Sequence, residues 1–192
     1  IGGEHSLGVK TGGTLWAWGG NWVGQLGIGG HSNSLSPVQV GTGLDWAMAA
    51  AGEGHSVALK TDGTLWAWGA NNHGQLGIGT WDGSNTPVQV GFDSNWRTVA
   101  AGNGHTVALK NDGTLWVWGE NTFGQLGNGT WNAFNIPVKI GTDTDWDLIA
   151  CAGIKTYAIK SDGSLWSWGC NEDGLLGIGI WNYEPVPVQV FP

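Results

Sequence analysis

Apolar positions in this chain alternate with polar ones over short runs, and no stretch follows the spacing of an amphipathic helix. In one portion of the chain this pattern predicts four strands, at residues 96–101, 105–110, 114–119 and 137–140. The second and third runs are joined by Asn111-Asp112-Gly113, and an Asp-Gly step between two β runs is a strong hairpin signal. The last run opens at Pro137, which suits an edge strand. We therefore predict an all-β protein with almost no helix.

The same pattern returns every fifty residues. A tryptophan pair in the third run recurs in four copies with no insertion or deletion: Trp16/Trp18, Trp66/Trp68, Trp116/Trp118 and Trp166/Trp168. Residues 51–100 and 101–150 are identical at 30 of 50 positions, so the copies should occupy near-identical environments. We predict one repeat domain, 1–192, built from units at about 1–42, 43–92, 93–142 and 143–192.

Each unit is apolar on both faces of its predicted sheet. In the third strand, Trp66 and Trp68 point to one side while Leu65 and Ala67 point to the other. A sheet that is apolar on both sides must be covered on both, and a neighbouring copy can do this if the sheets stack around an axis. Small residues at 50–52 suit the narrow end of such a wedge. We therefore predict a β-propeller of four-stranded blades, in preference to a flat solenoid.

The repeat motif can be compared with a known family. The pattern AGxGHSxALKxDGTLWxWGxNxxGQLGxG, followed by PVQV, resembles the regulator of chromosome condensation repeat. Residues 51–60, 62–69 and 74–79 carry the resemblance most closely, and it extends over essentially the whole chain. The resemblance implies a closed ring of seven blades. It says less about function, because the family includes exchange factors, photoreceptors, inhibitors and scaffolds.

The number of copies is smaller than the resemblance implies. The chain holds four blades at most, and Ile1 aligns with Ala51, so the first copy lacks its first strand. Three arrangements follow: a fragment of a longer array, a ring completed by two chains, or a ring that closes alone. Near-identical interfaces should repeat one angle, and an angle suited to a larger ring leaves two apolar faces bare. We favour the fragment and the oligomer.

Composition supports a packed protein and excludes some partners. Aromatic and charged residues each make up 11% of the chain, alongside 36 glycines, which favours a turn-rich β protein over a disordered one. The net charge is -8, and the seven Lys and Arg residues form no cluster, so we expect no nucleic-acid partner and no membrane insertion. Low charge with abundant Trp, Asn and Gly favours a secreted or cell-surface protein.

Repeated polar residues are better explained by structure than by chemistry. We expect His5, His55 and His105 to bond to backbone at the first turn of each blade and not to bind metal, because the fourth copy has Lys155.

Three hairpin acids, Asp62, Asp112 and Asp162, fit turn chemistry, since Gly12 replaces them in the first copy. Cys151 and Cys170 are not expected to form a disulfide. We predict no cofactor, and no arrangement of residues indicates an enzyme.

The candidate binding residues lie in the loops. His31, Trp81, Trp131 and Trp181 occupy one equivalent position before the last strand of each blade. An exposed aromatic there can stack on a sugar or anchor a protein, whereas the alternative is that each Trp folds back over its own blade edge. A second candidate surface consists of positions where the copies differ: Trp22-Val23, Asn72-His73, Thr122-Phe123 and Glu172-Asp173.

We predict a non-catalytic protein-binding or scaffold module, whose partner is another protein or a second copy of the chain. The alternative is a multivalent lectin that binds glycans through the loop tryptophans. Guanine-nucleotide exchange on a small GTPase ranks lower, because it rests on the family resemblance alone.

Overall fold

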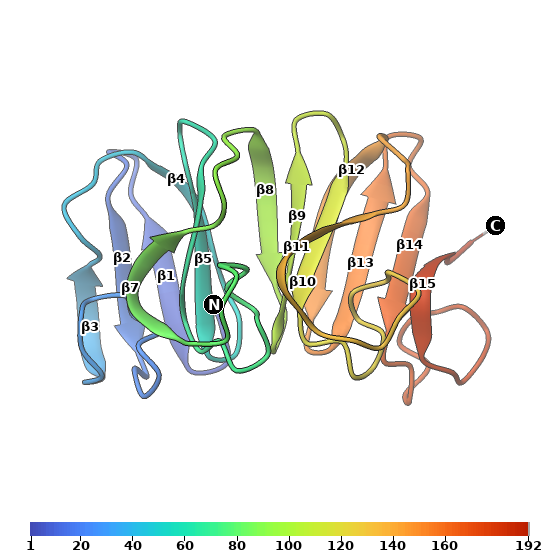
Figure 1. Ribbon diagram of the computed structural model, residues 1–192, viewed down its shortest axis with the longest axis horizontal. Coiled ribbons are helices and arrows are strands. Elements are labelled where there is room, and N and C mark those ends of the chain that lie inside the picture. The colour runs from blue at the N-terminus through green and yellow to red at the C-terminus, as the bar shows by residue number, and fades with distance from the viewer. Residues whose placement is uncertain (192) are drawn as a thin grey trace.

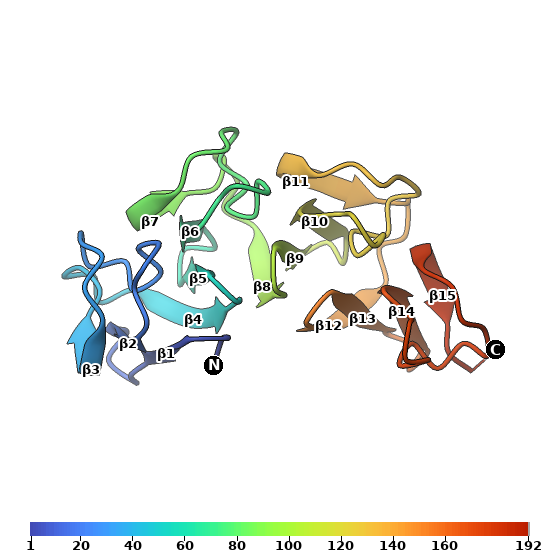
Figure 2. The same ribbon diagram turned by 90° about the horizontal axis from the view of Figure 1, so that it is seen from below.

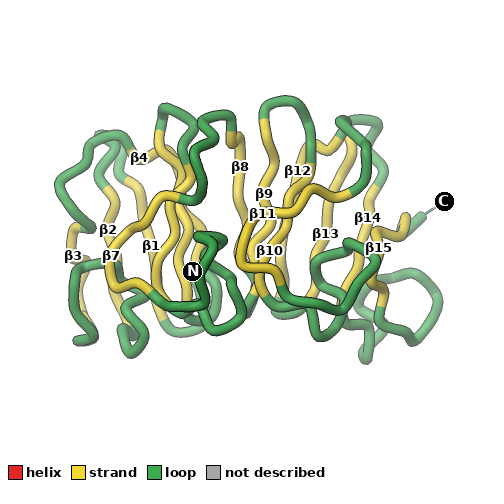
Figure 3. Tube along the Cα trace, in the orientation of Figure 1, coloured by secondary structure: helices red, strands yellow, loops and turns green. Residues whose placement is uncertain are grey.

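The computed structural model describes residues 1–191. The regular secondary structure of these residues consists of β-strands, without helices (Figures 1 and 3). The first two antiparallel sheets are β1 (His5–Val9), β2 (Leu15–Gly19) and β3 (Ser34–Gln39), then β4 (Trp46–Ala51), β5 (His55–Lys60), β6 (Leu65–Gly69) and β7 (Ser84–Gln89). The last two are β8 (Trp96–Ala101), β9 (His105–Lys110), β10 (Leu115–Gly119) and β11 (Phe134–Ile140), then β12 (Trp146–Ala152), β13 (Lys155–Lys160), β14 (Leu165–Gly169) and β15 (Glu184–Gln189).

The sequence pattern located these strands closely, with one correction. The first two predicted strands of the third copy match β8 and β9, and β10 begins one residue later than expected. The predicted start of the last strand at Pro137 is wrong, since β11 begins at Phe134. The register between β10 and β11 shifts between Val117 and Gly119, and β11 is an edge strand. A proline is tolerated inside such a strand because its missing N–H faces away from the ladder.

The four sheets stand side by side around an arc, each forming one blade (Figure 2). Strands β4, β8 and β12 lie on the inner side of the arc and contact one another, while β3, β7, β11 and β15 lie on the outer side. Within residues 1–191 the first blade has three strands and each of the others has four. The all-β propeller architecture predicted from the repeat is confirmed, and the described blades form an open arc.

Neighbouring blades pack through unlike faces. Leu65 and Ala67 pack against the third blade, where they meet Trp96 and Trp118. Trp68, on the opposite face of the same strand, packs against the first blade. The predicted division of strand β6 between two interfaces is therefore confirmed. The indole of Trp96 also meets that of Trp118 edge-on, with ring centroids 6.0 Å apart.

A repeated hydrogen-bond network joins the blades at the end where the longer loops lie. The main-chain oxygen of Gln75 accepts hydrogen bonds from Trp118 Nε1 at 2.9 Å and from Thr106 Oγ1 at 2.8 Å, both in the next blade. The same hydroxyl lies 3.0 Å from Nε2 of His55, which belongs to the blade that holds Gln75. The network recurs from Gln25 and from Gln125.

The histidines therefore have a different partner from the one predicted. Each bonds to a hydroxyl of the following blade and not to backbone at its own turn, with His5 on Ser56, His55 on Thr106 and His105 on Thr156. The hydroxyl already donates its hydrogen to a carbonyl, so Nε2 must carry the ring proton and donate it. The described residues offer no partner to Nδ1 of these three rings.

The face of the last blade that points away from the third blade is uncovered in residues 1–191. Tyr157, Ile159 and Leu165 border an apolar hollow there, together with Leu148 and Ile149. The Tyr157 hydroxyl donates to the main-chain oxygen of Leu175, the position whose oxygen accepts from the following blade in the other copies. Within the described residues there is no helix of the length and apolarity that a membrane crossing requires.

Candidate binding surface

The two ends of the blades differ in charge. One end, called here the loop end, carries the turns at 52–54, 102–104 and 152–154 and the long loops before β3, β7, β11 and β15. Among residues 1–191 this end holds one basic side chain, Lys155, and seven acidic ones: Glu4, Glu53, Asp82, Glu120, Glu172, Asp173 and Glu184. The opposite end, the hairpin end, has eight acidic and six basic side chains. The loop end is thus the acidic one.

Among residues 1–191, four of the six bases of the hairpin end form ion pairs. Lys110 Nζ lies 2.8 Å from Asp93 and 3.9 Å from the ring centroid of Trp116. Lys160 makes the equivalent ion pair with Asp143 at 2.6 Å, whereas Lys60 pairs at 3.1 Å with Asp45, two positions further along the repeat. This arrangement places each ammonium group over an indole ring and pairs its charge with a carboxylate.

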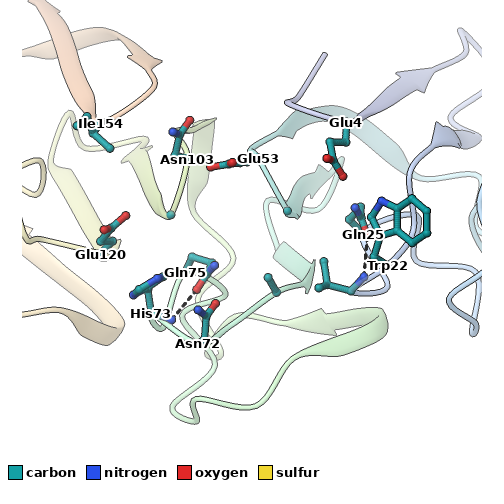
Figure 4. Close-up of a pocket in the computed structure, with 14 residues that line it drawn as sticks. Glu4, Trp22, Gln25, Glu53, Asn72, His73, Gln75, Asn103, Glu120 and Ile154 are labelled. Carbon is teal, nitrogen blue, oxygen red and sulfur yellow. Dashed lines mark hydrogen bonds between the residues drawn. The ribbon is translucent and has the colours of Figure 1, made fainter.

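A hollow with a volume of about 520 Å³ opens at the loop end (Figure 4). Its walls come from the first three blades and from Ile154 of the fourth. Glu4 and Trp22 lie on one side, Glu120 on the other and Glu53 between them (Figure 4). No lysine or arginine in the part of the chain that the structure describes lines this loop-end cavity.

Two of the glutamates make close contacts to glycine. A Cβ added to Gly20 would lie 3.2 Å from Trp22 Nε1 and 3.3 Å from Glu4 Cβ, so both side chains pack over the same glycine. A Cβ on Gly104 would lie 2.7 Å from Glu120 Oε2. The absence of a side chain at Gly104 is what lets the Glu120 carboxylate lie against that turn.

A buried asparagine in each blade holds the long loop of that blade through hydrogen bonds to its main chain. Asn71 donates from Nδ2 to the main-chain oxygens of Thr80 and Asp82, both at 2.9 Å, and its Oδ1 accepts from the N–H of Leu76. Asn21 makes the same contacts one copy earlier. The residue between the two bonded carbonyls, Trp81 in this copy, is therefore held at the tip of a rigid loop.

The predicted aromatic residues occupy these loop tips. Trp81 and Trp131 are about half exposed, at 50% and 49%, and Trp181 is 76% exposed. None of them lines the loop-end cavity. His31 is also exposed and borders a separate hollow with Val23 and Ser84. The structure thus presents these four residues separately, one on each blade, and does not bring them together.

The second predicted surface converges only in its first two blades. Trp22 and Val23 of the first blade and Asn72 and His73 of the second all line the loop-end cavity. Their equivalents Thr122, Phe123, Glu172 and Asp173 do not. Phe123 instead packs edge-on against Tyr183, with centroids 5.3 Å apart.

Sequence reasoning missed the three glutamates and the glutamines Gln25 and Gln75 of the same cavity. The glutamates occupy positions where the copies differ. Glu53 is equivalent to Asn103 in the next copy, and Glu120 is equivalent to Ala70 in the preceding copy. That variation was the available signal.

The remaining candidates are structural. The Asp62 carboxylate accepts from the N–H and hydroxyl of Thr64 at 2.9 and 2.7 Å, which is the expected turn bonding, and these bonds lower the pKa of Asp62. Cys151 and Cys170 are free, and burial raises the pKa of the Cys151 thiol to about 12. In residues 1–191 no group of three or more metal-binding side chains occurs.

Known proteins share the repeat and the fold. A family model described as the regulator of chromosome condensation (RCC1) repeat matches residues 12–59, 62–109, 112–159 and 162–192, and a second RCC1 repeat model matches 96–125. No curated protein sequence matches the chain.

Solved structures agree with the family models. Human WBSCR16 superposes with a TM-score of 0.90 at 27% identity, over 100% of this chain and 52% of its own. Yeast RCC1 (Prp20), bound to Kap60, gives a TM-score of 0.88 at 25% identity, over 98% of this chain and 47% of its own. The chain therefore spans about half the length of these structures. By its repeats and by its fold, the chain belongs to the RCC1 repeat family of β-propellers.

Proposed function

We propose that this chain is a non-catalytic protein-binding module that engages its partner through the loop end. The observation that carries the proposal is the convergence of the variable loop positions of the first two blades on one cavity. Trp22, Asn72 and His73 differ between copies, yet they are presented by a hydrogen-bonded frame that is repeated almost unchanged. A rigid frame with variable side chains is the usual arrangement of a recognition surface.

The relatives support binding to proteins. Yeast Prp20 is seen bound to Kap60, and its binding to Gsp1p and histones has been described. This chain spans about half of that structure, so neither those partners nor the activity of the whole protein is transferred to it. What the relatives support is the class of function.

Photo-cross-linking tests the proposal. A photoreactive amino acid replaces Asn72, which is exposed in the loop-end cavity, and in a control replaces Asp112 at the hairpin end. We expect discrete protein adducts in an extract of the source organism from position 72 and not from position 112. Adducts from neither position, or equally from both, would contradict binding through the loop end.

A lectin is the alternative for the loop tips, with His31, Trp81, Trp131 and Trp181 as its proposed ligand-binding residues. Partial exposure of the three indoles favours it, because an indole face stacks on a sugar ring. Their separation means that each site would act alone, with avidity as the gain. A glycan array without hits would exclude this alternative.

Self-association is proposed as a second property. The uncovered face around Ile159 and Leu165 has the same composition as the faces that are buried between blades. A second copy offers the matching surface at Trp16 and Trp18 of its first blade, which are only half-buried here. Exchange on a small GTPase ranks below both properties, because it rests on family membership alone.

A further inference from the structure

Three carboxylates of the loop-end cavity lack a cation. Within residues 1–191, Glu4, Glu53 and Glu120 form no ion pair, whereas the paired acids all lie at the hairpin end. Glu4 and Glu53 are exposed and Glu120 is half-buried. The cavity therefore presents uncompensated negative charge to whatever enters it.

Two buried amides add hydrogen-bond donors to the same cavity. Gln25 and Gln75 are 1% and 3% exposed, and both line the cavity. Their Oε1 atoms accept from the main-chain N–H of Val23 at 3.1 Å and of His73 at 2.9 Å. Because those partners can only donate, the bonds fix which end of each amide is oxygen. The Nε2 groups have no partner within residues 1–191 and are left to donate to a ligand.

The donors and acceptors together select the ligand. A metal ion would use the carboxylates but would be opposed by the two Nε2–H groups, which offer it hydrogens in place of lone pairs. A neutral sugar would satisfy the amides but would leave three carboxylates uncompensated. A peptide that carries a cationic side chain satisfies both sets, since its carbonyl oxygens accept from Gln25 and Gln75 while its charge faces the glutamates.

The indole of Trp22 favours arginine over lysine. Trp22 is 66% exposed and packs over the same glycine as Cβ of Glu4, so its ring lies on the side of the cavity that holds the Glu4 carboxylate (Figure 4). A guanidinium is planar and can stack on an indole while its five N–H groups bridge carboxylates. An ammonium group offers a point charge and three donors.

We propose that the loop-end cavity binds an arginine-rich segment of a protein partner. One guanidinium stacks on Trp22 on the side of the cavity that holds Glu4, and further arginines face Glu53 and Glu120 across it. The adjoining peptide carbonyls accept from Gln25 and Gln75. This inference rests on the proposed function and specifies the chemistry of the partner. Binding of an arginine-rich segment is expected to weaken with salt, because the contacts are largely electrostatic.

The experiment is an NMR titration of the 192-residue chain with the peptide acetyl-Gly-Arg-Gly-Arg-Gly-amide. Side-chain amide signals of Gln25 and Gln75 and the indole N–H of Trp22 report on the cavity. We expect all three to shift. A matched peptide with citrulline in place of arginine keeps the shape and loses the charge, and should bind at least about tenfold more weakly. A lysine peptide should be weaker by about two- to fivefold.

Charge variants locate the contact. Glu53→Gln and Glu120→Gln should each weaken binding of the arginine peptide by about three- to tenfold. Asp82→Asn is the matched control, since it removes one exposed charge from the same end outside the cavity and should leave the affinity unchanged.

Several results would overturn the proposal. These are equal binding of the citrulline peptide, a loss in Asp82→Asn as large as in Glu53→Gln, or signals that move with chitotriose and not with the peptide. Protein adducts from position 72 that the arginine peptide fails to compete away would leave the proposed function standing and refute this inference alone.

Discussion

At the scale of single residues, buried histidines carry a pH dependence. The pKa of His5 and of His105 is lowered to about 4 and that of His55 to about 3, chiefly by burial, with a smaller contribution from neighbouring positive charge at His5 and His55. Each ring is therefore neutral in the fold at neutral pH. Its Nδ1 atom has no partner in the described residues, so protonation would add a buried, unsatisfied charge.

The first prediction is that stability falls between pH 7 and pH 5. In the unfolded chain these histidines bind protons below about pH 6.5, while in the fold they do not until about pH 4. Protons thus favour the unfolded state in this window, by up to about 1.4 kcal/mol per pH unit for each histidine. Urea denaturation at pH 5, 6 and 7 measures the slope.

The matching variants are His55→Gln and His31→Gln. Removing the buried ring of His55 should reduce the slope by about one third, since three such rings contribute. His31 is exposed, so its replacement should leave the slope as in the wild type. Equal slopes in all three proteins would show that the buried rings do not cause the effect.

At the scale of elements, the blades are joined by both packing and hydrogen bonds. Trp118 is fully buried against the second blade and also donates to Gln75. Thr106 links the two blades a second time, since it lies between His55 and the oxygen of Gln75. Because each group in this network depends on the others, the loss of a single hydrogen bond should weaken the whole network.

The second prediction concerns that link. Thr106→Val preserves the shape but leaves His55 Nε2 without its partner, and should lower the free energy of unfolding by about 1–3 kcal/mol. Thr106→Ser keeps the hydroxyl, as Ser56 does naturally, and should cost about 1 kcal/mol or less for the lost methyl group. Chemical denaturation of both variants measures the difference, and equal losses would contradict a role for the hydroxyl.

At the scale of the whole molecule, the arc has two uncovered faces in the described residues. The face of the last blade is apolar around Ile159 and Leu165, and an exposed apolar surface of this kind is a site of association. Tyr157 already bonds the Leu175 oxygen, so this face offers one acceptor fewer to a following blade than the other faces do. Association there would rely on apolar contact.

The third prediction is that association depends on concentration and on this face. Sedimentation velocity of the wild type should show a larger species that grows with concentration. Ile159→Lys places a charge in the contact and should raise the dissociation constant by at least about tenfold. Phe92→Lys, at a fully exposed position of the turn between β7 and β8, is the control and should change nothing. A wild type that stays monomeric at its highest soluble concentration would contradict the prediction.

Local sequence patterns determined the strands, the repeat and the division of each sheet into two apolar faces, because alternation and turn residues act within a few positions. The start of β11 could not be predicted from Pro137, because a register shift against β10 decides it. The single-domain division at 1–192 stays a prediction.

Tertiary structure decided the rest. The alternation that places Trp66 and Leu65 on opposite faces is a property of any strand, whereas the hydroxyl partner of His55 comes from a residue fifty-one positions away. In the same way, Glu4, Glu53 and Glu120 are ordinary surface residues in the sequence, and they share a cavity only because three blades curve around a common side. The short-range pattern of each repeat specifies its own blade. Contacts between blades depend on the angle at which the sheets pack, and the sequence of a single copy does not specify that angle.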